Sequence, residues 1–154
     1  GLSVAKNIPD SKVFLLEKSD DAFDYLEKNL RSIGCKNATA VRCDIFDGFE
    51  KIGLPVPDLI LSNPPYIESD DIPSLQSEVL FEPSMALDGG NDGLDFYRAI
   101  CDKWLAYCNG AIAVECGEGQ AEIIEKMFSL YCGNTYSVTD FNGIKRVVIG
   151  SERK

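Results

Sequence analysis

Short runs of β-type residues alternate along the chain with longer stretches in which apolar residues recur at helical spacing. Strands are predicted over Lys12–Leu16 and Ala38–Cys43. Between them, the apolar spacing predicts a helix that begins after Ser19 and ends at Gly34, because serine caps helix starts and glycine ends helices. This order of strand, helix and strand is typical of a parallel sheet covered by helices.

The rest of the chain continues this pattern and then departs from it. Leu59–Ser62 is a predicted strand, and its unbroken apolar character predicts burial on both faces. Residues 67–92 are rich in Pro, Gly, Ser and Asp, which predicts a long loop with one short helix around Pro73–Leu80. The remaining predicted elements are a helix marked by Leu94 to Leu105, a strand over Ala111–Glu115, a helix marked by Ala121 to Tyr131, and an antiparallel hairpin of Thr135–Thr139 with Arg146–Ile149.

Together these elements predict an α/β fold in one domain over residues 1–154, with a doubly wound, mostly parallel sheet and a C-terminal antiparallel hairpin. The chain is 45% hydrophobic and 26% charged, which is ordinary for a soluble globular protein. No stretch approaches the roughly 20 apolar residues that span a bilayer. We therefore expect a cytoplasmic protein with no membrane partner.

The charge of the chain bears on the choice of substrate. Lys and Arg number 15 against 25 Asp and Glu, and the net charge of −10 disfavours binding to a phosphate backbone. Nucleic acid is therefore a poor candidate for the direct substrate, whereas a basic or neutral protein suits this charge. The chain has no histidine, and its six cysteines form no C-x-x-C pair, so no metal site is predicted. The cysteines are expected to be small buried apolar residues in a reducing cytosol.

Polar side chains follow three of the predicted strands. Ligands of open parallel sheets bind at the carboxyl ends of the strands, which makes Glu17, Asp44 and Asn63 candidates for binding. The Glu17 carboxylate can accept hydrogen bonds from both hydroxyls of a ribose. A glutamate beside Lys18 at a strand end is, by itself, more often a solvated charge.

Asp44 has two interpretations that the sequence leaves open. Its carboxylate can receive the exocyclic amino group of an adenine, with Ile45 or Phe46 against the ring, or it can cap a turn into Asp47 and Gly48. The candidate cofactor-binding residues are Glu17, Lys18, Asp44, Ile45 and Asn63.

The turn after the third strand carries the most specific signal, and it consists of Asn63, Pro64, Pro65 and Tyr66. Two consecutive prolines restrict the backbone and hold the asparagine side chain in a defined direction. The Asn63 side-chain carbonyl and the Pro64 C=O can accept both hydrogens of a planar NH2 group, which presents the nitrogen lone pair to a methyl donor. Tyr66 can cover the planar group and exclude water.

The sequence around this turn resembles the release-factor glutamine methyltransferases, the PrmC/HemK family of class I methyltransferases that use S-adenosylmethionine. The Asn-Pro-Pro-Tyr turn alone is shared with DNA adenine and ribosomal RNA guanine N-methyltransferases, but its acidic, glycine-rich continuation is more specific. The resemblance covers nearly the whole chain. The similar segments are 58–67, Glu78-Val79, Glu82-Pro83, 86–90, 92–95, Tyr97-Arg98, 115–117 with Gln120, 140–143 and 146–148.

The resemblance implies a Rossmann-like fold and N5-methylation of a glutamine in the Gly-Gly-Gln motif of peptide chain release factors, with S-adenosylhomocysteine as the second product. By position, Glu17 would bind the ribose, and Asp44 and Ile45 would line the adenine site. Asn63, Pro64 and Tyr66 would be catalytic, because they would orient the target amide. The implied substrate-binding residues are Asn63, Pro64, Pro65, Tyr66, Glu82 and Pro83.

Parts of the family pattern are missing from these residues. Family members carry a central strand and a glycine-rich turn that passes under the methionine part of the cofactor, and a helical substrate-recognition domain before them. This chain opens at Gly1 inside what we expect to be the helix after that turn, so we expect an N-terminally truncated domain. The missing strand would lie between the strands that end at Glu17 and Ser62. Cys116 also stands where the resemblance leads us to expect a larger residue.

Other functions remain open at this stage. A nucleic-acid N-methyltransferase acting on adenine or guanine would need the same clamp on a planar NH2 group. A non-catalytic binding module could keep the fold without the cofactor loop. A nicotinamide-dependent dehydrogenase is a distant third, because these residues contain no G-x-G-x-x-G.

Overall fold

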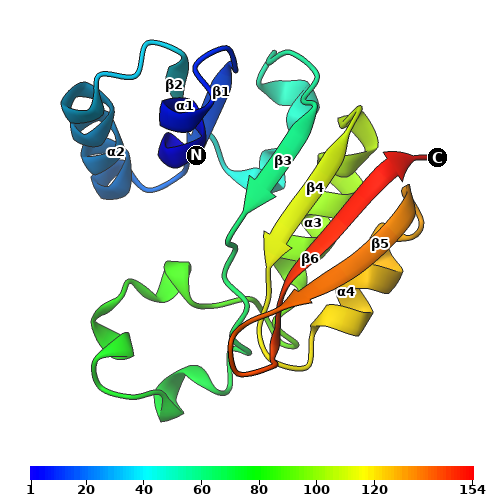
Figure 1. Cartoon of the computed structure of the whole chain (residues 1–154). Coiled ribbons are helices and arrows are strands. Elements are labelled where there is room, and N and C mark those ends of the chain that lie inside the picture. Colours follow the sequence, from blue (N-terminus) through cyan, green and yellow to red (C-terminus); the bar gives the residue numbers. More distant parts are fainter. The chain divides into compact units, whose positions relative to one another are not determined.

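The computed structural model describes all residues, 1–154, and they divide into two compact units, Gly1–Ile52 and Gly53–Lys154. Each unit has its own sheet: β1 and β2 form one, and β3, β4, β6 and β5 form the other (Figure 1). β1 and β3 are therefore not hydrogen-bonded to each other, and the resemblance had led us to expect a further strand between them. No helix has both the length and the apolar character that crossing a membrane would require.

The first unit contains α1 (Leu2–Asn7), β1 (Val13–Glu17), α2 (Asp20–Ile33) and β2 (Ala38–Arg42). The two strands pair in parallel along their whole length, so their carboxyl ends lie at the same edge. The predicted strands are confirmed to within one residue at each end. The chain also begins in a helix, as expected.

Helix α2 has the limits that the sequence predicts. The Ser19 hydroxyl accepts a hydrogen bond from the Ala22 backbone N–H at 3.3 Å, which satisfies one of the unpaired amides of the first turn. Gly34 ends the helix in a left-handed conformation with φ of 71°, which glycine adopts without steric cost. The Arg42 guanidinium lies 4.1 Å from the centre of the Phe23 ring and links the helix to β2.

The sheet of the second unit contains β3 (Leu59–Ser62), β4 (Ala111–Glu115), β5 (Cys132–Thr139) and β6 (Lys145–Arg153). β3 and β4 are parallel, and β6 runs antiparallel to both β4 and β5. The predicted C-terminal hairpin is confirmed, and both of its strands are longer than expected. The mixed sheet with covering helices confirms the predicted α/β class.

Helices α3 (Asp95–Lys103) and α4 (Ala121–Phe128) lie behind the four-stranded sheet, on one of its faces (Figure 1). Both helices are shorter than predicted: a 3-10 turn over Leu105–Tyr107 follows α3, and α4 ends three residues before Tyr131. Their apolar faces and the central strands supply the core. Side chains exposed by 1% or less include Tyr97, Ile100, Ile112, Val114, Ile124, Phe128 and Val148.

The prediction that β3 is buried on both faces is wrong. Leu59 and Leu61 are 48% and 49% exposed. β3 is an edge strand with β4 as its one neighbour, and Ile60 lies opposite the fully buried Ile112. Because successive side chains of a strand point to opposite faces, Leu59 and Leu61 lie on the face away from that core residue.

Residues 67–92, which we call the arm, form a long connection that reaches away from the sheet of the second unit (Figure 1). The expected single helix around Pro73–Leu80 is wrong, because the arm contains three separate 3-10 turns, Ile72–Ser74, Val79–Phe81 and Ser84–Ala86. Turns of this length are common where a connection lacks the packing that would stabilise a longer helix.

All six cysteines are free thiols, and five of them are buried. Burial raises the pKa of the Cys101 thiol to about 12, so it stays protonated at neutral pH. Cys116, where the resemblance led us to expect a larger residue, is fully buried. The prediction that these residues act as small apolar side chains is confirmed for Cys43, Cys101, Cys108, Cys116 and Cys132.

Two neighbouring isoleucines of α4 provide a matched test of this packing. Ile124 is fully buried, whereas Ile123 is 50% exposed. We expect Ile124→Ala to lower the free energy of unfolding by ~2–5 kcal/mol because it opens a cavity, and Ile123→Ala by less than about 1 kcal/mol. Urea denaturation of both variants measures the difference, and equal losses would contradict this placement of α4.

Candidate active site

The carboxyl ends of β1 and β2 bring together the predicted cofactor residues of the first unit. The Cys43 backbone N–H donates to the Glu17 carbonyl oxygen at 3.1 Å, which ties the two strand ends to each other. The Lys18 Nζ lies 2.7 Å from the Asp44 Oδ2. This ion pair raises the pKa of Lys18, first through the hydrogen bond to Asp44 and then through its charge.

The carboxylates of Glu17 and Asp44 also accept hydrogen bonds from the local backbone. The Glu17 Oε1 accepts the Ser19 N–H at 2.8 Å, just before α2. The Asp44 Oδ1 accepts the Phe46 N–H at 2.9 Å and caps a 3-10 turn over Ile45–Asp47. The turn-capping interpretation of Asp44 is thus confirmed, while its role towards an adenine stays a prediction.

In the second unit, the Asn-Pro-Pro-Tyr turn follows β3 directly. Its peptide bonds are all trans, Asn63 is exposed and Pro64 is buried. Neither the Asn63 side chain nor the Pro64 carbonyl oxygen has a hydrogen-bond partner within the protein. Ser62 lies opposite Val114 in the parallel register, so the turn begins beside the end of β4.

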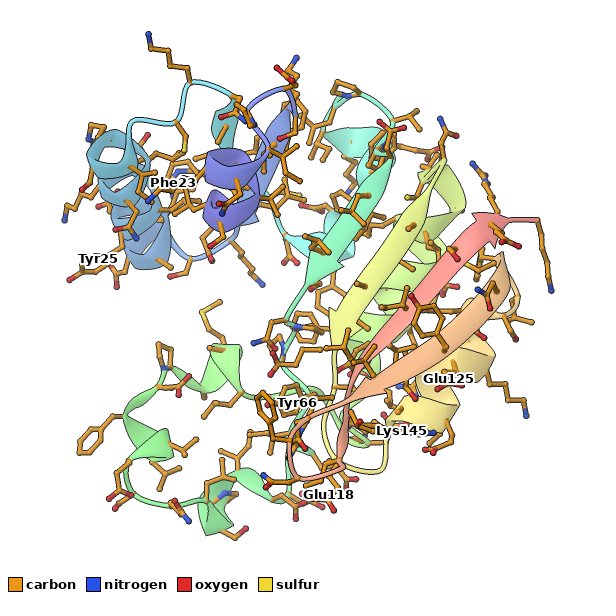
Figure 2. The ribbon with its side chains drawn as sticks, in the orientation of Figure 1. Phe23, Tyr25, Tyr66, Glu118, Glu125 and Lys145 are labelled. Atoms are coloured by element: carbon orange, nitrogen blue, oxygen red, sulfur yellow. The ribbon has the colours of Figure 1, made fainter.

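Tyr66 ends the turn and is partly buried at the point where β3 passes into the arm (Figure 2). Burial raises the pKa of the Tyr66 hydroxyl, and the negative charge of Glu115 raises it further, while Arg146 acts in the opposite direction. Tyr66 is therefore a neutral phenol at physiological pH. The hydroxyl of the fully buried Tyr97 donates to the Glu115 carbonyl oxygen at 2.8 Å and ties α3 to the end of β4.

Three glycines lie close to Tyr66, and at two of them a side chain would overlap the Tyr66 backbone. A Cβ on Gly89 would lie 2.8 Å from the Tyr66 Cα, and one on Gly93 would lie 2.4 Å from the Tyr66 carbonyl oxygen. A Cβ on Gly117 would lie 3.2 Å from the Tyr66 ring. The loops that contain these glycines can therefore approach the turn and form its supporting wall.

Gln120 joins these loops to the turn. Its Nε2 donates to the Tyr66 carbonyl oxygen at 2.9 Å and to the Gly93 carbonyl oxygen at 3.4 Å, and its Oε1 accepts the Gly117 N–H at 2.9 Å. The resemblance implied that the Gly89-Gly90 turn shapes the loop beside the substrate, but no role at this site was predicted for Gln120, Glu115, Gly93 or Gly117. Their only signal was their presence in the segments that resemble the family.

The arm is anchored at its base, next to the turn. The Ile67 N–H donates to the Leu87 carbonyl oxygen at 3.0 Å, and the Gly89 N–H donates to the Ile67 carbonyl oxygen at 2.8 Å. The predicted substrate residues Glu82 and Pro83 lie farther along the arm, where both are exposed. No hydrogen bond or ion pair connects them to Asn63.

Several known proteins with glutamine methyltransferase names are similar to this chain in sequence. A release factor glutamine methyltransferase of Geobacter sulfurreducens is 42% identical over 97% of this chain and 52% of its own length. A protein of the same name from Thermodesulfovibrio yellowstonii is 37% identical over 99% of this chain and 55% of its own length. By sequence, the chain is a homologue of the release factor glutamine methyltransferases. It spans about half the length of these curated relatives.

More distant comparisons agree on the fold. A ribosomal protein uL3 glutamine methyltransferase of Francisella tularensis is 32% identical over 81% of this chain and 40% of its own length. The structure of TrmN from Thermus thermophilus matches 98% of this chain and 40% of the TrmN chain, with a TM-score of 0.65 at 17% identity. TYW2 of M. jannaschii, solved in complex with AdoMet, matches 99% of this chain and 63% of its own, with a TM-score of 0.55 at 13% identity. No protein-family model matches the chain. The fold is that of the class I methyltransferases.

Two glycines with similar backbones test the crowding around Tyr66. Gly93 and Gly119 have φ of 69° and 83°, so alanine is strained at both positions, but nothing lies within 4 Å of a Cβ on Gly119. We expect Gly119→Ala to lower the free energy of unfolding by ~1–2 kcal/mol. Gly93→Ala should lower the free energy of unfolding by a further ~1–3 kcal/mol, because its Cβ would overlap the Tyr66 carbonyl oxygen. Chemical denaturation compares the two, and equal costs would argue against the close approach.

Proposed function

We propose that residues 1–154 form a methyltransferase catalytic domain that transfers a methyl group from S-adenosylmethionine to the side-chain amide nitrogen of a glutamine. The observation that carries this proposal is the pair of acceptors at Asn63 and Pro64, which follow β3 and have no partner within the protein. Homology to glutamine methyltransferases supports the choice of glutamine, and the names of the relatives support a release factor as the substrate. The resemblance noted in the sequence implies that the target glutamine lies in the Gly-Gly-Gln motif.

The first unit has hydrogen-bond acceptors that suit the nucleoside part of S-adenosylmethionine. The Glu17 carboxylate accepts the Ser19 amide through Oε1, and its second oxygen retains capacity for a ribose hydroxyl. Asp44 would accept the adenine amino group, with Ile45 beside the ring. Lys18 would hold the Asp44 carboxylate in position through their 2.7 Å ion pair. When bound, S-adenosylmethionine would supply the electrophilic methyl group.

The protein's task in this reaction is alignment, because an amide nitrogen is a weak nucleophile whose lone pair is delocalised into its carbonyl. The Asn63 side-chain carbonyl and the Pro64 C=O would accept both hydrogens of the target NH2 and fix the direction of its lone pair. Alignment of this kind is worth up to ~7–11 kcal/mol in model reactions. Tyr66 would cover the planar amide and exclude water, and its raised pKa fits a neutral wall better than a proton acceptor.

The charge and the exposed side chains of the arm suit a polypeptide partner with a basic surface. It has seven acidic residues and no Lys or Arg, so it carries most of the excess negative charge of the chain. Phe81 is 88% exposed, and Leu80 and Met85 are about half exposed. An acidic segment with an exposed aromatic side chain would repel nucleic-acid phosphates and suits a cationic protein surface. The acidic residues are Glu68, Asp70, Asp71, Glu78, Glu82, Asp88 and Asp92.

The role of Asn63 is tested by comparing methyl transfer with cofactor binding. We expect Asn63→Ala in the intact protein to slow transfer to a release factor by on the order of 100-fold, because the target nitrogen loses its orientation. Binding of S-adenosylhomocysteine, measured by calorimetry, should stay within about twofold of the wild-type value.

Asn134→Ala, at an exposed position of β5, is the control and should leave transfer unchanged. Full activity of Asn63→Ala would remove the assignment. Wild-type protein that binds no S-adenosylhomocysteine would favour a non-catalytic module, and transfer to RNA in preference to release factor would favour the nucleic-acid alternative.

The arm is tested through Phe81, whose exposed side chain contributes little to the core. We expect Phe81→Ser to raise the KM for the release factor about tenfold, equivalent to ~1.4 kcal/mol, without changing kcat or the affinity for S-adenosylhomocysteine. Leu130→Ser is the matched control, because Leu130 is 74% exposed and follows α4, outside the arm. Equal effects of the two substitutions on KM would argue against docking on the arm.

A further inference from the structure

Gln120 makes three hydrogen bonds that connect separate loops to the turn after β3. One amide hydrogen goes to the Tyr66 carbonyl oxygen, the other approaches the Gly93 carbonyl oxygen, and the side-chain oxygen accepts from the Gly117 amide. The bond to Tyr66 joins residues 54 positions apart in the sequence. Gln120 therefore ties the turn to the start of α4.

The chemistry of these contacts requires an amide side chain of this length. Two backbone carbonyls need donors and one backbone amide needs an acceptor, which is the complement that a glutamine amide offers. A glutamate would keep the bond to the Gly117 amide but would place a negative charge against the carbonyl oxygens of Tyr66 and Gly93. A methionine of similar length would lose all three bonds.

The position of Tyr66 is coupled to that of Asn63. Pro64 and Pro65 separate the two residues, and their rings restrict the rotation of the intervening backbone. A displacement of the Tyr66 backbone is therefore transmitted to Asn63. Because Asn63 has no hydrogen bond of its own within the protein, its position depends on this backbone and on the contacts that hold it.

We infer that Gln120 is a positioning residue for methyl transfer: its amide holds the Tyr66 carbonyl and thereby keeps Asn63 and Pro64 in the geometry that orients the target nitrogen. This inference rests on the proposed function and adds a residue outside the Asn-Pro-Pro-Tyr turn to the machinery of that site. Displacements of about 1 Å in a reacting geometry can reduce rates by on the order of 100-fold. The same bonds fix the glycine loops that close around Tyr66.

Gln120→Glu and Gln120→Met test the inference in the intact protein. We expect both to lower kcat for methyl transfer at least tenfold, while the affinity for S-adenosylhomocysteine stays within about twofold, because the bonds lost support the turn rather than the cofactor residues. Ile124→Val is the stability control, since it removes a buried methyl group at a modest cost and should leave kcat unchanged at a temperature where all variants are folded. Glu118→Gln, at an exposed position of the same loop, is the local control (Figure 2).

A second readout does not depend on activity. The Gly117 amide should exchange its hydrogen faster in Gln120→Met, which lacks the acceptor, and at the wild-type rate in Gln120→Glu, which keeps it. The amide signal of Ile67, which follows the Tyr66 carbonyl, should shift in both variants. If wild-type protein transfers no methyl group, the proposed function fails while this readout still tests the bonds. Measurable transfer with kcat within about twofold of wild type in both variants would overturn the inference.

Discussion

The backbone of Tyr66 lies in a space that Gly89 and Gly93 leave open, and the Gln120 amide holds its carbonyl oxygen. Asn63, three residues earlier, is exposed and makes no hydrogen bond of its own within the protein. Because no neighbouring group forms a hydrogen bond with the Asn63 side chain, its position depends on the backbone. The two prolines link Asn63 to the anchored Tyr66, because they restrict the chain between these two residues.

The core of the second unit supports the end of the sheet at which the Asn63 to Tyr66 turn lies. α3 and α4 bury their apolar faces against the central strands, and the Tyr97 hydroxyl reaches from α3 to the Glu115 carbonyl oxygen at the end of β4. Buried polar groups are costly unless they are paired, so this bond both satisfies Tyr97 and fixes the strand end beside the turn. Exposed polar side chains at the strand ends are thus carried by a closely packed interior.

The arm differs from this interior in charge and in packing. Hydrogen bonds between Ile67, Leu87 and Gly89 close its base, while its outer part consists of short 3-10 turns with exposed apolar and acidic side chains. Such a segment gains little from burial within its own chain, which leaves its apolar side chains available to a partner. The anchored base of the arm lies next to Tyr66, so the proposed substrate would extend from the turn along the arm.

The sequence by itself determined the α/β class, the caps of α2, the C-terminal hairpin and the Asn63 to Tyr66 turn, because periodicity, capping residues and prolines act over a few neighbouring residues. It did not predict the exposure of Leu59 and Leu61, since whether a strand lies at an edge depends on which strands pair with it. Nor did it assign a role to Gln120, because a hydrogen bond between residues 54 positions apart leaves no periodic signal. Only the tertiary structure brings such partners together. In it, the glycine-containing loops approach the turn closely enough for the Gln120 side chain to reach the Tyr66 carbonyl oxygen.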